Sequence, residues 1–150
     1  MAQRGGSVIA QIRYGEYVYS PLVAYGEAAV LIALERVEGL RFHRYLRPDG
    51  LAVVSSQMIV PVSVSSGAAV YPNDVEERLR TTYPRLIYLD ATRIAGELGN
   101  AKAANVVLIG AMSTALDLPA EAWEEAIRGC VNSRYVDINI AAFQAGRAQA

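Results

Sequence analysis

Cysteine and histidine are almost absent from this 150-residue chain, which contains one of each. The single cysteine, Cys130, excludes a disulfide within the chain and any cluster held by several cysteine thiolates. The single histidine, His43, leaves too few ligands for an ordinary zinc or copper site. The sequence therefore predicts no metal site in this chain, and its cysteine usage favours a reducing, cytoplasmic location.

Charged residues are also scarce, at 19% of the chain, and the formal net charge is −1. This balance argues against nucleic acid as a partner, because nucleic-acid binding needs a basic surface. No apolar run reaches the roughly 20 residues of a membrane-spanning helix, and the first residues lack the apolar core of a secretory signal. Hydrophobic residues make up 53% of the sequence. A short chain this apolar is expected to associate, with a partner or with itself when isolated.

The first part of the chain shows two strand patterns. Residues 7–14 alternate between apolar and polar side chains, which predicts a half-buried strand. Residues 15–16 have the Gly-first sequence of a two-residue hairpin loop, so residues 17–19 are expected to return beside the first strand. The continuous apolar run at residues 28–34 predicts a strand buried on both faces.

The pattern that follows is typical of a parallel sheet with crossover helices. Residues 35–46 predict a helix with Glu38 facing outward, residues 48–50 a turn, and residues 51–55 a second buried strand. The cycle repeats with a predicted helix, a strand and another helix at residues 73–83, 86–89 and 91–98. Asn73 and Glu76 have the spacing of a capping box at the start of the first of these helices. The sequence thus predicts a single α/β domain over residues 1–150, with a mostly parallel sheet.

From residue 100 onward the predicted structure is helical. Residues 101–116 are apolar almost all round, which predicts a helix that cannot face water. Gly110 in its middle would let another backbone approach closely. Two further helices are predicted at residues 120–129 and 134–145, with Phe143 facing inward on the last.

Few residues could carry chemistry, and no nucleophile lies beside a base in any recognisable pattern. We expect Cys130 to pack in the core and His43, on a surface helix, to be structural or solvent-facing. Asp90 follows a predicted strand at the edge where α/β sheets bind ligands. Capping of the next helix is the simpler role for it. The sequence therefore predicts no catalytic residues in this chain.

Two segments could contact a ligand or a partner. The N-terminal segment joins an arginine that could bind an anion to two glycines that allow close approach, although it could also be a loose lead-in. The second segment lies where the apolar helix begins, and helix starts attract anions, with Lys102 nearby. Taken alone, capping of the helix by Asn100 and a solvated Lys102 is the simpler interpretation. The predicted partner- or substrate-proximal residues are Gln3, Arg4, Gly5, Gly6, Asn100 and Asn105.

Short motifs spread in order along nearly the whole chain carry a family resemblance. They are MAQRGGSV (1–8), RYG (13–15), YSP (19–21), GEAAVLIALE (26–35), YLRPDG (45–50), IVPVS (59–63), DAT (90–92), LGNAKAAN (98–105) and NIAAF (139–143). In this order they resemble the gamma domain or subunit of 2-oxoacid:ferredoxin (acceptor) oxidoreductases, the pyruvate/ketoisovalerate oxidoreductase gamma-type domain. The likeness is strongest to the beta subunit of indolepyruvate ferredoxin oxidoreductase.

The resemblance implies a Rossmann-like three-layer domain that serves as an accessory subunit. The complex would oxidatively decarboxylate an aryl 2-oxoacid to an acyl-CoA and pass the electrons to ferredoxin. Thiamine diphosphate and iron–sulfur clusters are expected in the partner subunit, with none in this chain, which would be inactive alone. Ferredoxin would be reached through the complex.

One departure from the family pattern concerns the start of the chain. Family members begin with a strand and a Gly-Gly-Gln-Gly turn, whereas this sequence opens at the later Gln-Arg-Gly-Gly motif. We therefore expect an N-terminally truncated domain with an uncovered sheet edge. The alternative function is a stand-alone small-molecule-binding α/β regulatory domain without catalysis.

Overall fold

A three-stranded parallel sheet lies at the centre of the computed structural model, which describes residues 2–3 and 6–150. Its strands are β3 (Ala28–Ala33), β4 (Leu46–Ser55) and β5 (Leu86–Leu89), in the order β3-β4-β5. Ala33 lies opposite Val54, and Ser55 opposite Leu89. The strands predicted at residues 28–34, 51–55 and 86–89 are therefore confirmed, but β3 is not buried on both faces, because it is an edge strand and Ile32 is 38% exposed.

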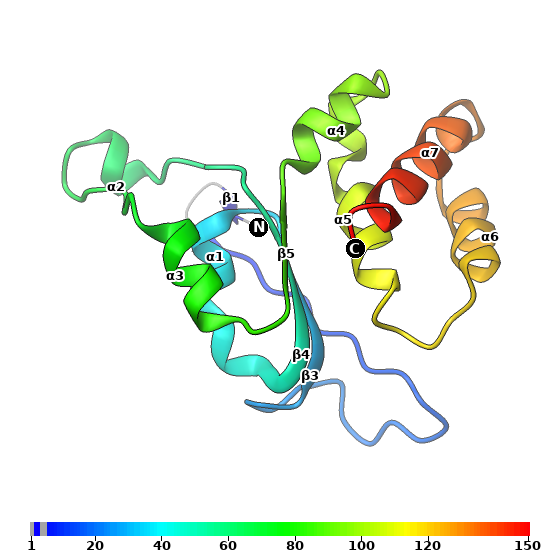
Figure 1. The fold of residues 1–150 in the computed structure, drawn as a ribbon, viewed down its shortest axis with the longest axis horizontal. Coiled ribbons are helices and arrows are strands. Elements are labelled where there is room, and N and C mark those ends of the chain that lie inside the picture. The colour runs from blue at the N-terminus through cyan, green and yellow to red at the C-terminus, as the bar shows by residue number, and fades with distance from the viewer. Residues whose placement is uncertain (1, 4–5) are drawn as a thin grey trace.

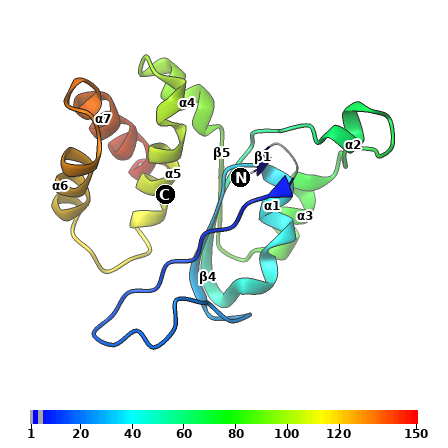
Figure 2. The same ribbon diagram turned by 180° about the vertical axis from the view of Figure 1, so that it is seen from behind.

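Helices cover both faces of the sheet and give the predicted three layers (Figures 1 and 2). On one face lie α1 (Arg36–Arg41) and α3 (Val75–Thr82). On the other lies α5 (Ala104–Ser113), backed by α4 (Ala91–Glu97) and α7 (Val136–Arg147), with α6 (Ala120–Cys130) outermost. A short helix, α2 (Val62–Ser65), lies in the connection before α3 and was not predicted.

The hydrophobic core has two parts, one on each face of the sheet, because successive side chains of a strand point to opposite faces. Ala52 and Val54 of β4 face α1 and α3, whereas Leu51 and Val53 face the α5 side. Each of these positions is 6% exposed or less. Both faces of β4 are thus covered from residue 50 onward, as a central parallel strand requires, whereas residues 47–49 are exposed.

The turn predicted at residues 48–50 is wrong, because these residues belong to β4. Ala28 pairs with Leu46 but Val30 pairs with Leu51, so β4 bulges outward between these two pairs. A β-carbon at Gly50 would lie 2.6 Å from the Leu46 side chain and 3.0 Å from the Ala29 carbonyl oxygen, so a larger residue there would have to displace Leu46. Turn-type residues also occur at bulges, which local sequence does not distinguish from turns.

The backbone of α5 packs directly against the backbone of α7, as predicted from Gly110. A β-carbon added at Gly110 would lie 2.9 Å from the carbonyl carbon of Phe143 and closer still to its oxygen. The contact is reciprocal, since a β-carbon at Gly146 would lie 2.8 Å from the carbonyl carbon of Val107. The buried position predicted for this helix is confirmed.

Several predicted helix boundaries are wrong. Residues 35–46 form α1 and a separate 3-10 turn, η1 (His43–Tyr45), and Glu38 is 6% exposed although it was expected outside. The first residues of the apolar helix form a 3-10 turn, η2 (Ala101–Ala103). The helix then ends at Ser113, where its hydroxyl donates 2.7 Å to the Gly110 carbonyl and competes with the backbone.

Two further expectations fail at helix ends. The capping box is wrong because α3 begins at Val75, with Asp74 as the N-cap residue and no hydrogen bond from its side chain. Cys130, expected in the core, is exposed at the end of α6. The last helix begins with another 3-10 turn, η3 (Ser133–Tyr135), and then matches α7 with Phe143 fully buried.

The predicted N-terminal strand and hairpin are also wrong. The only pairing there joins β1 (Ala2–Gln3) to β2 (Gly6–Ser7), in antiparallel fashion, among the described residues. Residues 8–25, called the arm below, contain no strand. Its apolar side chains stand open to solvent, with Ile12 84% and Tyr19 94% exposed. Alternation predicts a strand only where a neighbouring strand and a surface to cover exist, and the described part of this chain offers neither to the arm.

Candidate functional site

Glu35 lies at the carboxyl end of β3, at the sheet edge where α/β proteins place their ligands. Its carboxylate caps α1 by accepting hydrogen bonds from the backbone of Val37 at 2.8 Å and of Glu38 at 3.0 Å. The residue is 3% exposed. Burial of a carboxylate is tolerated here because the start of α1 supplies two donors.

Tyr71 completes this arrangement from a distant part of the chain. Its hydroxyl donates to the other carboxylate oxygen of Glu35 and accepts from Arg36 Nε at 3.1 Å. The Arg36 guanidinium also lies over the Tyr71 ring, 4.8 Å from its centroid. Burial raises the pKa of Tyr71 to about 12, and its hydrogen bond to Glu35 acts in the same direction. The hydroxyl is therefore a permanent donor at neutral pH.

A second buried carboxylate, Glu38, joins α1 to the N-terminal segment. Arg41 Nη1 lies 2.9 Å from one carboxylate oxygen, and the Ser7 hydroxyl donates to the other. Ser7 is the last residue of β2, so this bond fixes the base of the arm against α1. Both carboxylates are consumed by contacts within the chain, and neither is available as a general base.

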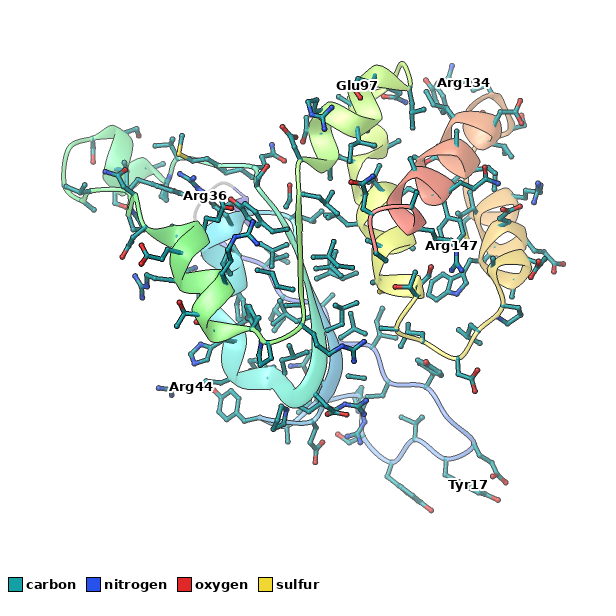
Figure 3. All side chains as sticks on the ribbon, in the orientation of Figure 1. Tyr17, Arg36, Arg44, Glu97, Arg134 and Arg147 are labelled. Atoms are coloured by element: carbon teal, nitrogen blue, oxygen red, sulfur yellow. The ribbon has the colours of Figure 1, made fainter. Side chains whose placement is uncertain are left out.

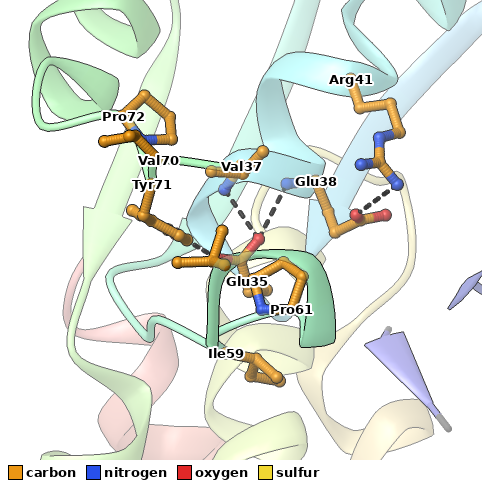
Figure 4. A pocket seen from close by; sticks show the side chains of 10 residues that line it. Glu35, Val37, Glu38, Arg41, Ile59, Pro61, Val70, Tyr71 and Pro72 are labelled. Atoms are coloured by element: carbon orange, nitrogen blue, oxygen red, sulfur yellow. Dashed lines mark hydrogen bonds and ion pairs between the residues drawn. The ribbon is translucent and has the colours of Figure 1, made fainter. Parts of the chain in front are cut away.

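A small cavity of about 160 Å³ is lined by Glu35, Glu38, Arg41 and Tyr71 from these contacts (Figure 4). The remaining wall is apolar and comes from the segment between β4 and α3, with Ile59, Pro61 and Val70 among its residues. This volume lies below the range of about 300–1,000 Å³ typical of small-molecule sites. The cavity suits a single small group and not a cofactor.

A larger hollow of about 670 Å³ lies among the helices on the opposite face of the sheet. It is formed where α4 is connected to α5 and where α6 is connected to α7. It is lined by Gly99, Asn100, Lys102, Ala103, Arg134, Tyr135, Ile138 and Asn139. Figure 3 shows Arg134 near the start of α7 and Glu97 at the end of α4, both at the same end of the molecule. The two charged residues in the lining are both cations.

The polar side chains of this hollow are held in place by the turns that form it. Asn100 Oδ1 accepts from the Lys102 backbone at 3.1 Å, and Asn139 Nδ2 donates to the Tyr135 carbonyl at 2.7 Å. The Arg134 guanidinium lies over the Tyr135 ring, 4.5 Å from its centroid. Asn139 is 8% exposed, so the amide forms part of the wall and does not reach into solvent.

The structure brings together only part of the predicted ligand-proximal set. Asn100 and Lys102 share the larger hollow, whereas Asn105 is exposed on α5 outside it. Gln3 and Gly6 lie opposite each other in the β1–β2 pair, and Arg4 and Gly5 fall outside the described residues.

Asp90 acts as the expected cap. Its carboxylate accepts from the Arg93 backbone at 2.9 Å at the start of α4. His43 is exposed, as expected, with Nδ1 2.9 Å from the Leu40 carbonyl. Neither residue takes part in the cavity or the hollow.

The buried cluster around Glu35 was not predicted from the sequence, and neither were Arg134 and Asn139 as lining residues of the hollow. An acidic residue directly after a buried strand was the one available signal for Glu35. Across residues 2–3 and 6–150, no three histidine, cysteine or acidic side chains gather as a metal site would require. Within the same residues, no helix has both the length and the apolar character needed to cross a membrane.

Comparisons with known proteins agree with one another. The protein-family model described as "Pyruvate ferredoxin/flavodoxin oxidoreductase" matches residues 1–149. The indolepyruvate oxidoreductase subunit IorB of Archaeoglobus fulgidus is 40% identical over 154 residues, covering 100% of this chain and 76% of that protein. The subunit of the same name from Pyrococcus horikoshii is 41% identical over 152 residues, covering 97% of this chain and 75% of its own length.

Among solved structures, the gamma subunit of a keto/oxoacid ferredoxin oxidoreductase from Geobacter sulfurreducens has the same fold, with a TM-score of 0.60 and 25% sequence identity. The match covers 83% of this chain and 65% of that subunit, slightly less than two thirds of its length.

Proposed function

The chain belongs to the pyruvate ferredoxin/flavodoxin oxidoreductase family, and we propose that it is the accessory subunit of an indolepyruvate-type 2-oxoacid:ferredoxin oxidoreductase. The observation that carries this proposal is the identity of 40–41% to the IorB subunits of Archaeoglobus fulgidus and Pyrococcus horikoshii across 97–100% of the chain. The complex would oxidatively decarboxylate an aryl 2-oxoacid to an acyl-CoA, with ferredoxin as the electron acceptor.

The chemistry of the described side chains supports an accessory role. The carboxylates of Glu35 and Glu38 are saturated by hydrogen bonds and an ion pair, and Tyr71 stays protonated. We therefore propose that thiamine diphosphate and the iron–sulfur clusters belong to the partner subunit, and that this chain is inactive alone. Its own contribution would be to pack against the thiamine-binding subunit and shape its surroundings.

The arm is the surface we assign to this contact. Its base is fixed by Ser7 on Glu38, and it closes on itself through Arg13 Nη1, which donates to the Leu22 carbonyl at 2.9 Å. Figure 3 shows Tyr17 at the far end of the arm, pointing away from the rest of the chain. Large apolar side chains held out in this way mark a surface that a partner covers.

The segment that leads into the arm belongs to the same proposed contact. Gln3 and Gly6 pair directly across from each other, and Gly6 adjoins Ser7 at the base of the arm. Arg4 would bind an anion or the partner, and Gly5 and Gly6 would allow close approach. Asn100 and Asn105 remain second candidates for a position near the partner or substrate.

Co-expression with the thiamine-binding subunit tests the proposal. We expect a stable complex that reduces ferredoxin in the presence of indolepyruvate and coenzyme A, and no activity from either chain alone. A chain that stays by itself, with no complex and no 2-oxoacid-dependent ferredoxin reduction, would refute the subunit assignment.

Paired variants then locate the contact. Ile12→Ser with Tyr19→Ser should weaken complex formation at least about tenfold, because both side chains are exposed and would be buried by the partner. Val62→Ser is the control, since Val62 is 77% exposed on α2, which lies away from the arm in Figure 1 and outside the cavity lining. Equal loss from both changes would remove the arm from the interface while leaving the subunit assignment intact.

A further inference from the structure

Lys102 and Arg134, on opposite turns of the larger hollow, carry positive charge that the protein does not neutralise. Lys102 is the only lysine in the sequence. Six ion pairs occur among the described residues, and each uses an arginine elsewhere in the chain. Neither Lys102 nor Arg134 takes part in one, and the hollow has no acidic residue in its lining. The lining of the hollow is therefore positive although the chain as a whole has a net charge of −1.

The shape and lining of the hollow suit a small organic molecule. Its volume of about 670 Å³ falls within the range of about 300–1,000 Å³ typical of such sites. Tyr135 and Ile138 give it an apolar wall, and Asn100 and Asn139 are held there by their own hydrogen bonds. A concave surface with an apolar wall and a few convergent polar groups is the usual form of a ligand site.

We propose that the hollow binds the phosphate group of a small molecule. A phosphate monoester carries a charge of about −1.5 to −2 at neutral pH, which matches the two unpaired cations, whereas a single carboxylate carries only one. Arginine presents a planar fork that can hold two phosphate oxygens, and lysine adds a point charge. The site goes beyond the proposed function, because it is complete within this chain and needs no partner subunit.

The single lysine provides a direct probe. Reductive methylation with ¹³C-formaldehyde leaves the charge of Lys102 in place and gives one side-chain signal besides that of the terminal amine. The full chain is titrated at fixed ionic strength with inorganic phosphate, phenyl phosphate and benzoate. We expect both phosphates to move the Lys102 signal to saturation, and benzoate to need at least about tenfold higher concentration.

Two variants decide whether the shift reports the proposed site. Arg134→Gln should weaken phosphate binding about tenfold, because it removes a charged hydrogen-bond donor from the hollow. Arg128→Gln, an exposed arginine of α6 outside the lining, should leave binding unchanged. A Lys102→Gln variant followed by calorimetry gives the second measurement, with about the same tenfold loss.

The outcomes separate cleanly. Tighter binding of phenyl phosphate than of inorganic phosphate supports an organic phosphate that uses the apolar wall, and equal binding supports free phosphate. The proposal is overturned if neither phosphate gives a saturable shift, or if Arg134→Gln binds as tightly as the unaltered chain. Because no partner subunit is present, these results leave the oxidoreductase assignment untouched.

Discussion

Replacement of Gly110 by alanine is the smallest change that probes the packing of α5 on α7. The added β-carbon would lie 2.9 Å from the carbonyl carbon of Phe143 and 3.1 Å from the Arg147 nitrogen. Both atoms belong to the backbone of α7, so no side-chain rotation relieves the overlap, and the two helices must move apart. Overpacking of a core costs about 1–3 kcal/mol, and we expect the upper part of this range here.

The helix propensity of alanine offsets part of this loss. Alanine is favoured over glycine by about 1 kcal/mol in a helix interior, so the net destabilisation should be about 2 kcal/mol. Gly129→Ala in α6 is the matched control, because its β-carbon meets nothing within 4 Å. That change should be neutral or stabilise by up to about 1 kcal/mol.

Urea denaturation followed by circular dichroism measures both variants. The midpoint should fall for Gly110→Ala and stay or rise for Gly129→Ala, with an unchanged slope for both if unfolding stays two-state. A Gly110→Ala protein as stable as the Gly129→Ala control would refute the close contact between the helices. It would also remove the reason given for a glycine in the middle of the apolar helix.

Two further predictions concern the half-buried Tyr71 and the buried Tyr83. Tyr71→Phe leaves one oxygen of the buried Glu35 carboxylate without its donor and should cost about 1–3 kcal/mol in urea denaturation, whereas Tyr14→Phe on the exposed arm should change stability by less than about 0.5 kcal/mol. Burial raises the pKa of both Tyr71 and Tyr83 to about 12, above the ordinary value of about 10. Because the neutral form is favoured in the folded state, their contribution should be complete below about pH 10 and disappear as the pH rises towards 12. Urea midpoints between about pH 8 and 11.5 should fall less steeply in Tyr83→Phe than in the unaltered chain, and parallel curves would contradict this account.

The elements predicted correctly are those whose cause is local. The strands β3 and β5 were predicted from their own apolar runs, because strands in a sheet covered by helices carry mostly apolar side chains. Asp90 caps the helix that follows it directly, with the bond formed three residues along. Gly110 was identified as a close-contact position because a helix that is apolar all round must meet other chain segments on every side. The family assignment rested on nearly the whole length of the chain, and it is confirmed.

The errors have non-local causes. Glu38 was expected on the surface because it is charged, but Ser7, 31 residues earlier, folds back to meet it. The start of α3 was placed at Asn73, yet the fully buried Val75 sets the first turn of the helix through its packing. The alternating pattern of the arm is typical of a strand, but a strand forms only where a neighbouring strand can pair with it. The local sequence does not show whether such a neighbour exists.

The buried cluster and the hollow could not be predicted for the same reason. Tyr71 reaches Glu35 across 36 positions of sequence, through a connection whose course no periodic pattern specifies. Arg134 shares the hollow with Lys102 only because two helix turns meet at one end of the molecule. The sequence pointed to Asn100 and Lys102 on one side of the hollow, but no local pattern indicated Arg134 on the other side.

The reciprocal glycine contact has a consequence for the hollow. Lys102 precedes α5 and Arg134 precedes α7, so the spacing between the two cations follows from how these helices cross. At Gly110 and Gly146 that crossing is set by main-chain atoms, which cannot rearrange as side chains do. The hollow is therefore preorganised: folding has already fixed its width, and an incoming anion need not spend binding energy on drawing its two walls together.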